Sequence, residues 1–172
     1  MTEHVVTPAQ VDGSDEQQFV RLNLERWALL LGQALVHEGV PSEGEVGLRF
    51  VDAPDMAELN ALHMGKTGPT DVLAFPLDFA ELIRRDAINP EPLDAHGPPM
   101  IGDVVICPSV AADAVRDGHD LDDELALLVV HGALHLIGHD HYDEAERAVM
   151  QARERALLAT FHTAATAERS GT

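Results

Sequence analysis

The stretch HGALHLIGHDH, residues 131–141, contains the side chains of this sequence that are best suited to bind a metal ion. His131 and His135 are four positions apart, so on a helix they lie on one face, one turn apart, and can bind the same ion. Gly138 follows the last apolar turn and can adopt the left-handed conformation that ends a helix. The chain would then fold back and bring His141 to the same ion from outside the helix.

The ligand types in this stretch indicate which ion it would bind. Three imidazoles without a thiolate suit Zn²⁺, and three protein ligands leave a fourth position for water, as in catalytic zinc sites. Nickel, copper and iron also accept histidine ligands. Histidines that only satisfy one another in a core would explain an isolated pair, but they explain the pattern H-x3-H-x2-G-x2-H poorly. We therefore expect one Zn²⁺ per chain, bound by His131, His135 and His141, with His139 pointing outward as a spare or supporting residue.

The general base is less clearly indicated than the ligands. Zinc proteases with this histidine spacing carry a catalytic glutamate where this chain has Gly132, which counts against peptide hydrolysis. Asp140, next to a ligand, is the candidate for orienting a histidine or for accepting a proton from metal-bound water, and a simple turn aspartate is the alternative. Glycine on a helix costs about 1 kcal/mol relative to alanine, so we expect a substrate or a neighbouring strand to approach the backbone at Gly132.

The histidines need elements that hold them in place. Asp120 can cap a helix that runs to Ile137, and because this helix is apolar nearly all round we expect it in the centre of the domain. A capping box of Ser14 and Gln17 predicts an amphipathic helix from there to Gly39. The remaining predicted elements are strands over 46–52, 70–75 and 101–108, and helices from Asp52 to about His63, from Ser109 to Arg116, and after Asp143 and Glu146.

Length and composition predict a single domain over residues 1–172, with frayed ends over 1–13 and 166–172. Residues 78–99 are rich in proline and charge, and we expect a long loop over or near the site. Cys107 lies in an apolar run, so a buried, inert thiol and a reducing cytoplasm are expected. The chain has neither a signal peptide nor a transmembrane pattern, which predicts a soluble, cytoplasmic protein without a membrane partner.

The charge of the chain limits its contacts with nucleic acid. A formal net charge of −19 repels phosphate backbones at long range, so we expect no binding to DNA and only local contacts with RNA.

Three stretches of the sequence resemble the YbeY family: HGALHLIGHDH, GPTDVLAFP at 68–76, and IGDVVICPSVA at 101–111. The family signature H-G-x-L-H-L-x-G-Y-D-H recurs here with His139 in place of tyrosine. The resemblance extends from about VGLRFVD to the last helix. It implies a zincin-like α+β fold, with a mixed four-stranded sheet flanked by helices and the metal site on a central buried helix. It also implies His131, His135 and His141 as the zinc ligands.

The resemblance further implies an activity. Members of the family are zinc-dependent, single-strand-specific endoribonucleases in late 16S rRNA 3′-end maturation and ribosome quality control. The implied partners are a ribosomal RNA precursor, small-subunit ribosomal proteins and an assembly GTPase. The alternative is a ribosome-assembly factor that binds without cutting and contains a structural zinc. A peptidase is a third interpretation, which Gly132 disfavours.

The chain departs from the family pattern at one position. In LNALHMGKTGPTDVLAFP, Met64 stands where the family has an arginine thought to help catalysis. The cations that could contact RNA instead, each with an ordinary surface role as the alternative, are Lys66, His63, Arg84 and Arg85. Three further residues match the motif, either as substrate contacts or through caps and turn hydrogen bonds: Asn60, Thr70 and Asp71.

Overall fold

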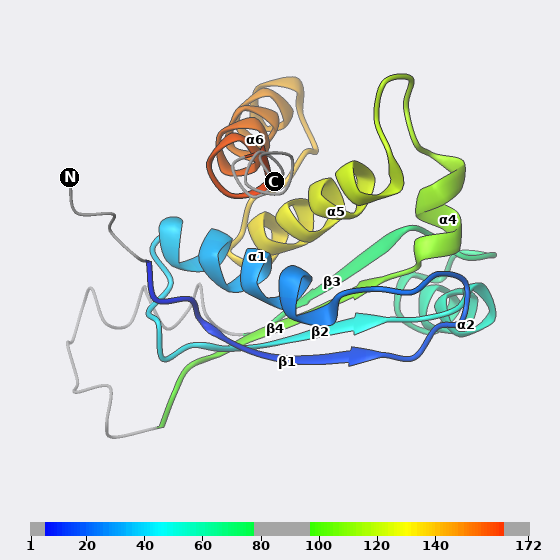
Figure 1. Cartoon of the computed structure of the whole chain (residues 1–172), viewed down its shortest axis with the longest axis horizontal. Helices are drawn as coiled ribbons and strands as arrows, with labels where there is room; N and C mark the ends of the chain where they lie inside the picture. The colour runs from blue at the N-terminus through cyan, green and yellow to red at the C-terminus, as the bar shows by residue number, and fades with distance from the viewer. Residues whose placement is uncertain (1–5, 78–96, 164–172) are drawn as a thin grey trace, which may run out of the picture.

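The computed structural model describes residues 6–77 and 97–163, and within them the chain forms one four-stranded sheet (Figure 1). The strands are β1 (Gln10–Asp15), β2 (Glu45–Phe50), β3 (Val72–Pro76) and β4 (Met100–Ile106). Their order in the sheet is β1-β2-β4-β3. β2 is parallel to both β1 and β4, whereas β3 is antiparallel to β4. This mixed sheet confirms the α+β class that the family resemblance implies.

The helices cover the two faces of the sheet unequally. The main core lies between the sheet and two helices, α1 (Leu24–His37) and α5 (Leu121–Leu136), and includes Val104 of β4. Val105, the next residue, points to the opposite face, because side chains alternate along a strand. There it packs with Met56 of α2 (Ala53–Met64) and with buried Cys107 in a smaller cluster. α5 therefore lies in the main core, as its apolar sequence predicts.

The helices after β4 complete the fold. α4 (Pro108–Asp113) follows β4, and α6 (Glu144–Leu157) lies beyond α5, away from the sheet (Figure 1). A short π-helical segment, η2 (Leu158–Thr163), continues α6 and was not expected from the sequence. No helix in the described part of the chain is long and apolar enough to cross a membrane.

Both ends of α5 form as the sequence predicts. At its start, the Asp120 carboxylate accepts from the Asp123 N–H and the Asp123 carboxylate from the Asp120 N–H, which is a complete capping box. At its end, Gly138 has φ +98°, in the left-handed region. The Gly138 N–H donates to the His135 carbonyl and the His139 N–H to the Leu134 carbonyl, as in a Schellman motif. This turn sends the chain back toward α5.

The close approach expected at Gly132 is made by a strand. A Cβ atom at this position would lie 2.7 Å from Cγ1 of Val104 on β4, well inside van der Waals contact. Glycine therefore lets α5 lie directly on β4 and sets how far the two histidines of α5 stand from the sheet.

The N-terminal region differs from our prediction. Residues 10–13, expected to be frayed with the rest of 1–13, belong to β1 and pair with β2. The helix predicted from Ser14 begins only at Leu24, where Asn23 caps it by accepting from the Arg26 N–H. The Ser14 hydroxyl instead donates to the Glu16 carboxylate. The spacing of Ser14 and Gln17 therefore matches a capping box, although Ser14 lies in β1 and Gln17 in the segment that follows it.

The other elements predicted within the described ranges are found, with boundaries shifted by a few residues. Most of the predicted 78–99 loop, including Arg84 and Arg85, lies outside the described residues, and so does the tail expected to fray over 166–172. These expectations stay predictions, as does the single-domain organisation.

Candidate metal centre

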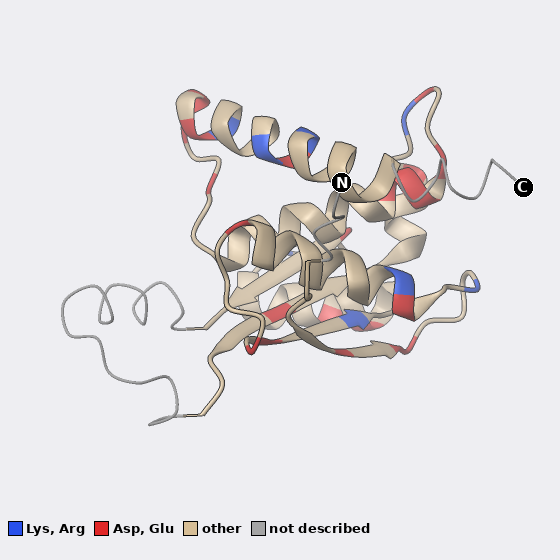
Figure 2. Cartoon of the chain, turned by 60° about the vertical axis from the view of Figure 1, so that its left-hand side comes forward, with Lys and Arg blue, Asp and Glu red and all other residues tan. Residues whose placement is uncertain are grey.

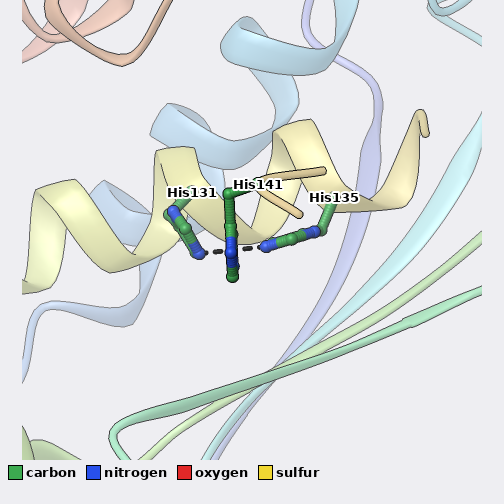
Figure 3. Close-up of side chains that lie close together, drawn as sticks. All are labelled: His131, His135 and His141. Carbon is green, nitrogen blue, oxygen red and sulfur yellow. Dashed lines mark hydrogen bonds between the residues drawn. The ribbon is translucent and has the colours of Figure 1, made fainter. Parts of the chain in front are cut away.

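Three histidines converge beneath the C-terminal end of α5 (Figure 3). His131 and His135 project from successive turns of this helix, and His141 approaches from the segment after Gly138. One ring nitrogen from each histidine lies within 4.8 Å of the other two. The His131 and His135 Nε2 atoms are 3.0 Å apart and share a hydrogen bond. His131 and His135 are partly buried, whereas His141 is exposed.

This geometry fits one metal ion with small side-chain movements. Two nitrogens that bind an ion tetrahedrally at about 2.0–2.1 Å lie roughly 3.3 Å apart, close to the separation of the two Nε2 atoms. Burial, and then the neighbouring His131 and His141, lower the pKa of His135. The neutral imidazole that results is the form that binds a metal. Because the group offers three nitrogens, a fourth position would stay open to water or substrate.

His131 has a carboxylate partner on its other ring nitrogen, which we did not predict. The Nδ1 atom lies 2.6 Å from Oε1 of Glu154, on α6. Glu154 is buried with Met150 and Leu157, whereas most other residues of α6 are exposed. An acidic residue at helical spacing between two apolar ones is the sequence signal that could have identified it.

A cleft of about 670 Å³ opens beside the histidines. One wall comprises residues of α5 and of the turn after it, and the other comprises residues of α2, of β3 and of the segment between them. The lining residues are Asn60, Met64, Lys66, Thr70, Asp71, Val72, Leu73, Ala74, Pro76, His131, Gly132, His135, Gly138, His139, Asp140, His141 and Tyr142. The cleft therefore brings the three histidines together with the GPTDVLAFP segment.

The predicted site residues take different positions around this cleft. Lys66 and Asp140 line it, and the Asp140 Oδ1 accepts from the His141 N–H at 2.7 Å, a turn contact beside the cluster. His63 packs edge-on against Phe75 of β3, with ring centroids 4.8 Å apart, and is absent from the lining. His139 lines the cleft but is not part of the three-nitrogen group.

The three other motif residues hold the wall opposite α5. The buried Asn60 donates from Nδ2 to the Gly68 carbonyl at 2.8 Å. The Asp71 Oδ1 accepts from the Val72 N–H at 2.8 Å and from the Thr70 hydroxyl at 3.4 Å. These contacts order the turn that leads into β3, and they are the cap and turn hydrogen bonds given as the alternative to substrate contacts.

Negatively charged side chains outnumber positively charged ones in this protein. Acidic residues are spread over most elements, whereas lysine and arginine are few (Figure 2). Of the described residues that line the cleft, Lys66 is the only lysine or arginine, and Met64 lies nearby in the same wall. An anionic ligand would therefore depend on Lys66 and on whatever cation the histidines bind.

These features define an α+β protein with a three-histidine site that opens onto a cleft, the arrangement of a catalytic metal site more than of a closed structural one. The family model described as "Endoribonuclease YbeY" matches residues 11–162. The chain belongs to this family.

Several relatives are described by the same name, "Endoribonuclease YbeY". The protein of Corynebacterium glutamicum is 38% identical over 167 residues, which cover 94% of this chain and 77% of the relative. The protein of Beutenbergia cavernae is 41% identical, with 86% and 89% covered. The protein of Salinispora tropica is 45% identical, with 76% and 82% covered. Membership in this family supports an RNA-cleaving role.

A solved structure has a similar fold. The solution structure of TM1509 from Thermotoga maritima superposes with a TM-score of 0.53 at 21% identity, over 90% of this chain and 93% of that chain. At this identity the likeness concerns the fold alone.

Proposed function

We propose that this protein is a zinc-dependent endoribonuclease that cuts single-stranded RNA. The observation that carries the proposal is the convergence of His131, His135 and His141 at the wall of an open cleft, in a chain of the endoribonuclease family. These three residues would hold the ion, one per chain. When bound there, Zn²⁺ supplies a Lewis acid that polarises a phosphoryl oxygen or makes water a better nucleophile.

Other residues of the chain would bind the RNA. Lys66, in the cleft wall, would contact a phosphate of the bound strand. His63, which stands beside Met64 on α2, and Arg84 and Arg85, outside the described residues, are the further candidates for RNA contacts. The apolar part of the wall, β3, would lie along the unpaired nucleotides.

Asp140 is the candidate general base. Its Oδ1 accepts from the His141 N–H, which fixes the carboxyl group beside the histidine cluster. A carboxylate held there can accept a proton from an attacking water. The ribose 2′-hydroxyl is the alternative nucleophile. The two routes leave different product ends, and a 2′,3′-cyclic phosphate would exclude attack by water as the only step.

We infer that the biological substrate is a ribosomal RNA precursor, cut in the late maturation of the 16S rRNA 3′ end and in ribosome quality control in the cytoplasm. The net charge of −19 supports a setting in which protein contacts bring the chain to RNA. Small-subunit ribosomal proteins and an assembly GTPase are the proposed partners.

The second candidate function is a ribosome-assembly factor that binds without cutting and holds a structural zinc. The observation that favours it is Met64 in the cleft wall, in a cleft with few cations. In this alternative the ion would hold the last helix, α6, against the core. His135→Ala would then disturb folding and particle binding together.

The first experiment is the metal content of the untagged protein, purified without chelator, beside its His135→Ala variant. We expect about one zinc per chain by mass spectrometry, and its loss in the variant. The zinc-loaded protein should then cut a single-stranded precursor of the 16S 3′ end and leave a duplex intact. A folded wild-type protein without stoichiometric metal would refute the proposal. A zinc-loaded protein that binds but never cuts would favour the assembly factor.

A further inference from the structure

We propose that Glu154 is a positioning residue of the metal centre, which orients His131 and couples the docking of α6 to metal binding. The inference rests on the metal site of the proposed function. It starts from a short contact, since Oε1 of Glu154 lies 2.6 Å from Nδ1 of His131. Only 11% of the Glu154 side chain is exposed. A carboxylate this buried is costly unless it is paired, and His131 provides the pairing.

The direction of this hydrogen bond fixes the tautomer of His131. An ionised carboxylate can only accept, so the Nδ1–H of His131 donates to Glu154. In the neutral ring, Nε2 then carries a lone pair, and this is the atom that faces the Nε2 of His135. Glu154 therefore selects the tautomer whose free nitrogen points into the three-histidine group. A carboxylate behind a ligating histidine also makes the histidine a better donor to the metal.

The same contact joins α6 to the site at a second point. The chain leaves the histidine cluster at His141, enters α6 at Glu144, and returns to the cluster with Glu154. The buried residues of α6 are Met150, Glu154 and Leu157, so its packing against the rest of the protein is limited. Part of what holds α6 in place is thus the pairing with His131. An ion that orders His131 and His141 should also hold α6 more firmly.

The test compares zinc affinity in the full-length wild type, Glu154→Gln and Glu144→Gln. Glutamine keeps the shape of Glu154 and removes its charge. Glu144→Gln makes the same change at an exposed position of α6. Competition with a chromophoric chelator should give a zinc dissociation constant about 10 to 100 times higher for Glu154→Gln. Glu144→Gln should match the wild type. The absorption spectrum of bound Co²⁺ should change in Glu154→Gln only.

The outcomes separate this inference from the function on which it rests. A wild type that does not bind zinc overturns both. A wild type and a Glu154→Gln variant with equal zinc affinity overturn only the positioning role and leave the metal site standing. If Glu154→Gln does not fold, the tautomer of His131 in the wild type still tests the positioning role. Nitrogen NMR of the metal-free wild type should show neutral His131 protonated at Nδ1, and an Nε2-protonated ring would refute the proposal.

The coupling between zinc binding and the docking of α6 is tested separately, by hydrogen exchange. Zinc should slow hydrogen exchange of the α6 amides in the wild type by about tenfold or more, and by less in Glu154→Gln. A contact that only packs α6 against α5 predicts equal protection with and without zinc, and that result would overturn the coupling.

Discussion

Met64 lies in the cleft wall, where an anionic substrate would meet few cations. Replacing it with arginine places a planar, permanently charged group there, which can bind a phosphate through two hydrogen bonds. We expect Met64→Arg to lower KM for a labelled single-stranded oligoribonucleotide about tenfold, the equivalent of one charge-assisted hydrogen bond. The control is Leu62→Arg, which adds the same charge at an exposed position of α2 outside the cleft lining. An equal effect of both variants would refute a local contact.

Asp140→Asn tests the proposed base. The amide still accepts from the His141 N–H, so the fold and the zinc content should not change. Loss of the proton acceptor should lower kcat about 10²- to 10⁴-fold, with little change in KM. Single-turnover cleavage and metal analysis of the same sample measure both. Wild-type kcat in the variant would exclude Asp140 and favour attack by the ribose 2′-hydroxyl.

At the scale of residues, the sequence predicts the part of the site that is local. His131, His135 and His141 are brought together by one helical turn and one glycine turn, and both follow from spacing. Glu154 is 23 positions from His131, and the two meet only because α6 packs against α5. The spacing within α6 marks Glu154 as a residue of the buried face, but it cannot identify His131 as its partner until the packing of the two helices is known.

At the scale of elements, Gly132 sets the distance between α5 and β4. Gly132→Ala should destabilise the protein by about 1–2 kcal/mol, because overpacking against Val104 outweighs the gain in helix propensity. Val104→Ala alone should also destabilise by leaving a cavity. The double variant should be more stable than the sum of the two changes predicts, because the smaller residue makes room for the new methyl group.

Urea unfolding of the four proteins measures this coupling. Additive effects would mean that α5 and β4 move apart freely, so that Gly132 does not set their spacing. Zinc affinity of Gly132→Ala is a second readout, because the helix that would shift carries both His131 and His135.

β1 is a strand that the sequence pattern did not predict, and its residues show why. Its sequence, QVDGSD, has little apolar alternation, and most of its side chains are exposed or half-buried. The strand forms because its backbone pairs with β2 in parallel, from Gln10 with Glu45 to Asp15 with Phe50. That pairing depends on the intervening α1 as a crossover, a long-range condition that local periodicity cannot show. α5, by contrast, carries its own caps and its own apolar surface, and both of its ends were predicted.

At the scale of the whole molecule, the net charge makes RNA binding depend on a few local contacts. Each phosphate contact with a single strand contributes about −0.7 to the slope of log K against log salt concentration. Lys66 is the only lysine or arginine among the described cleft-lining residues. We therefore expect a shallow slope for the wild type and a slope smaller in magnitude by about 0.7 for Lys66→Ala, measured by fluorescence anisotropy on a single-stranded oligoribonucleotide.

The control for that measurement separates a contact from a change in overall charge. Arg21→Ala removes the same charge from an exposed residue that does not line the cleft. It should leave the slope unchanged and weaken binding only slightly, because long-range attraction is screened within about 10 Å at 0.1 M salt. If Lys66→Ala and Arg21→Ala have equal slopes, the strand does not pass Lys66. RNA recognition would then depend on residues outside this cleft or on the proposed protein partners.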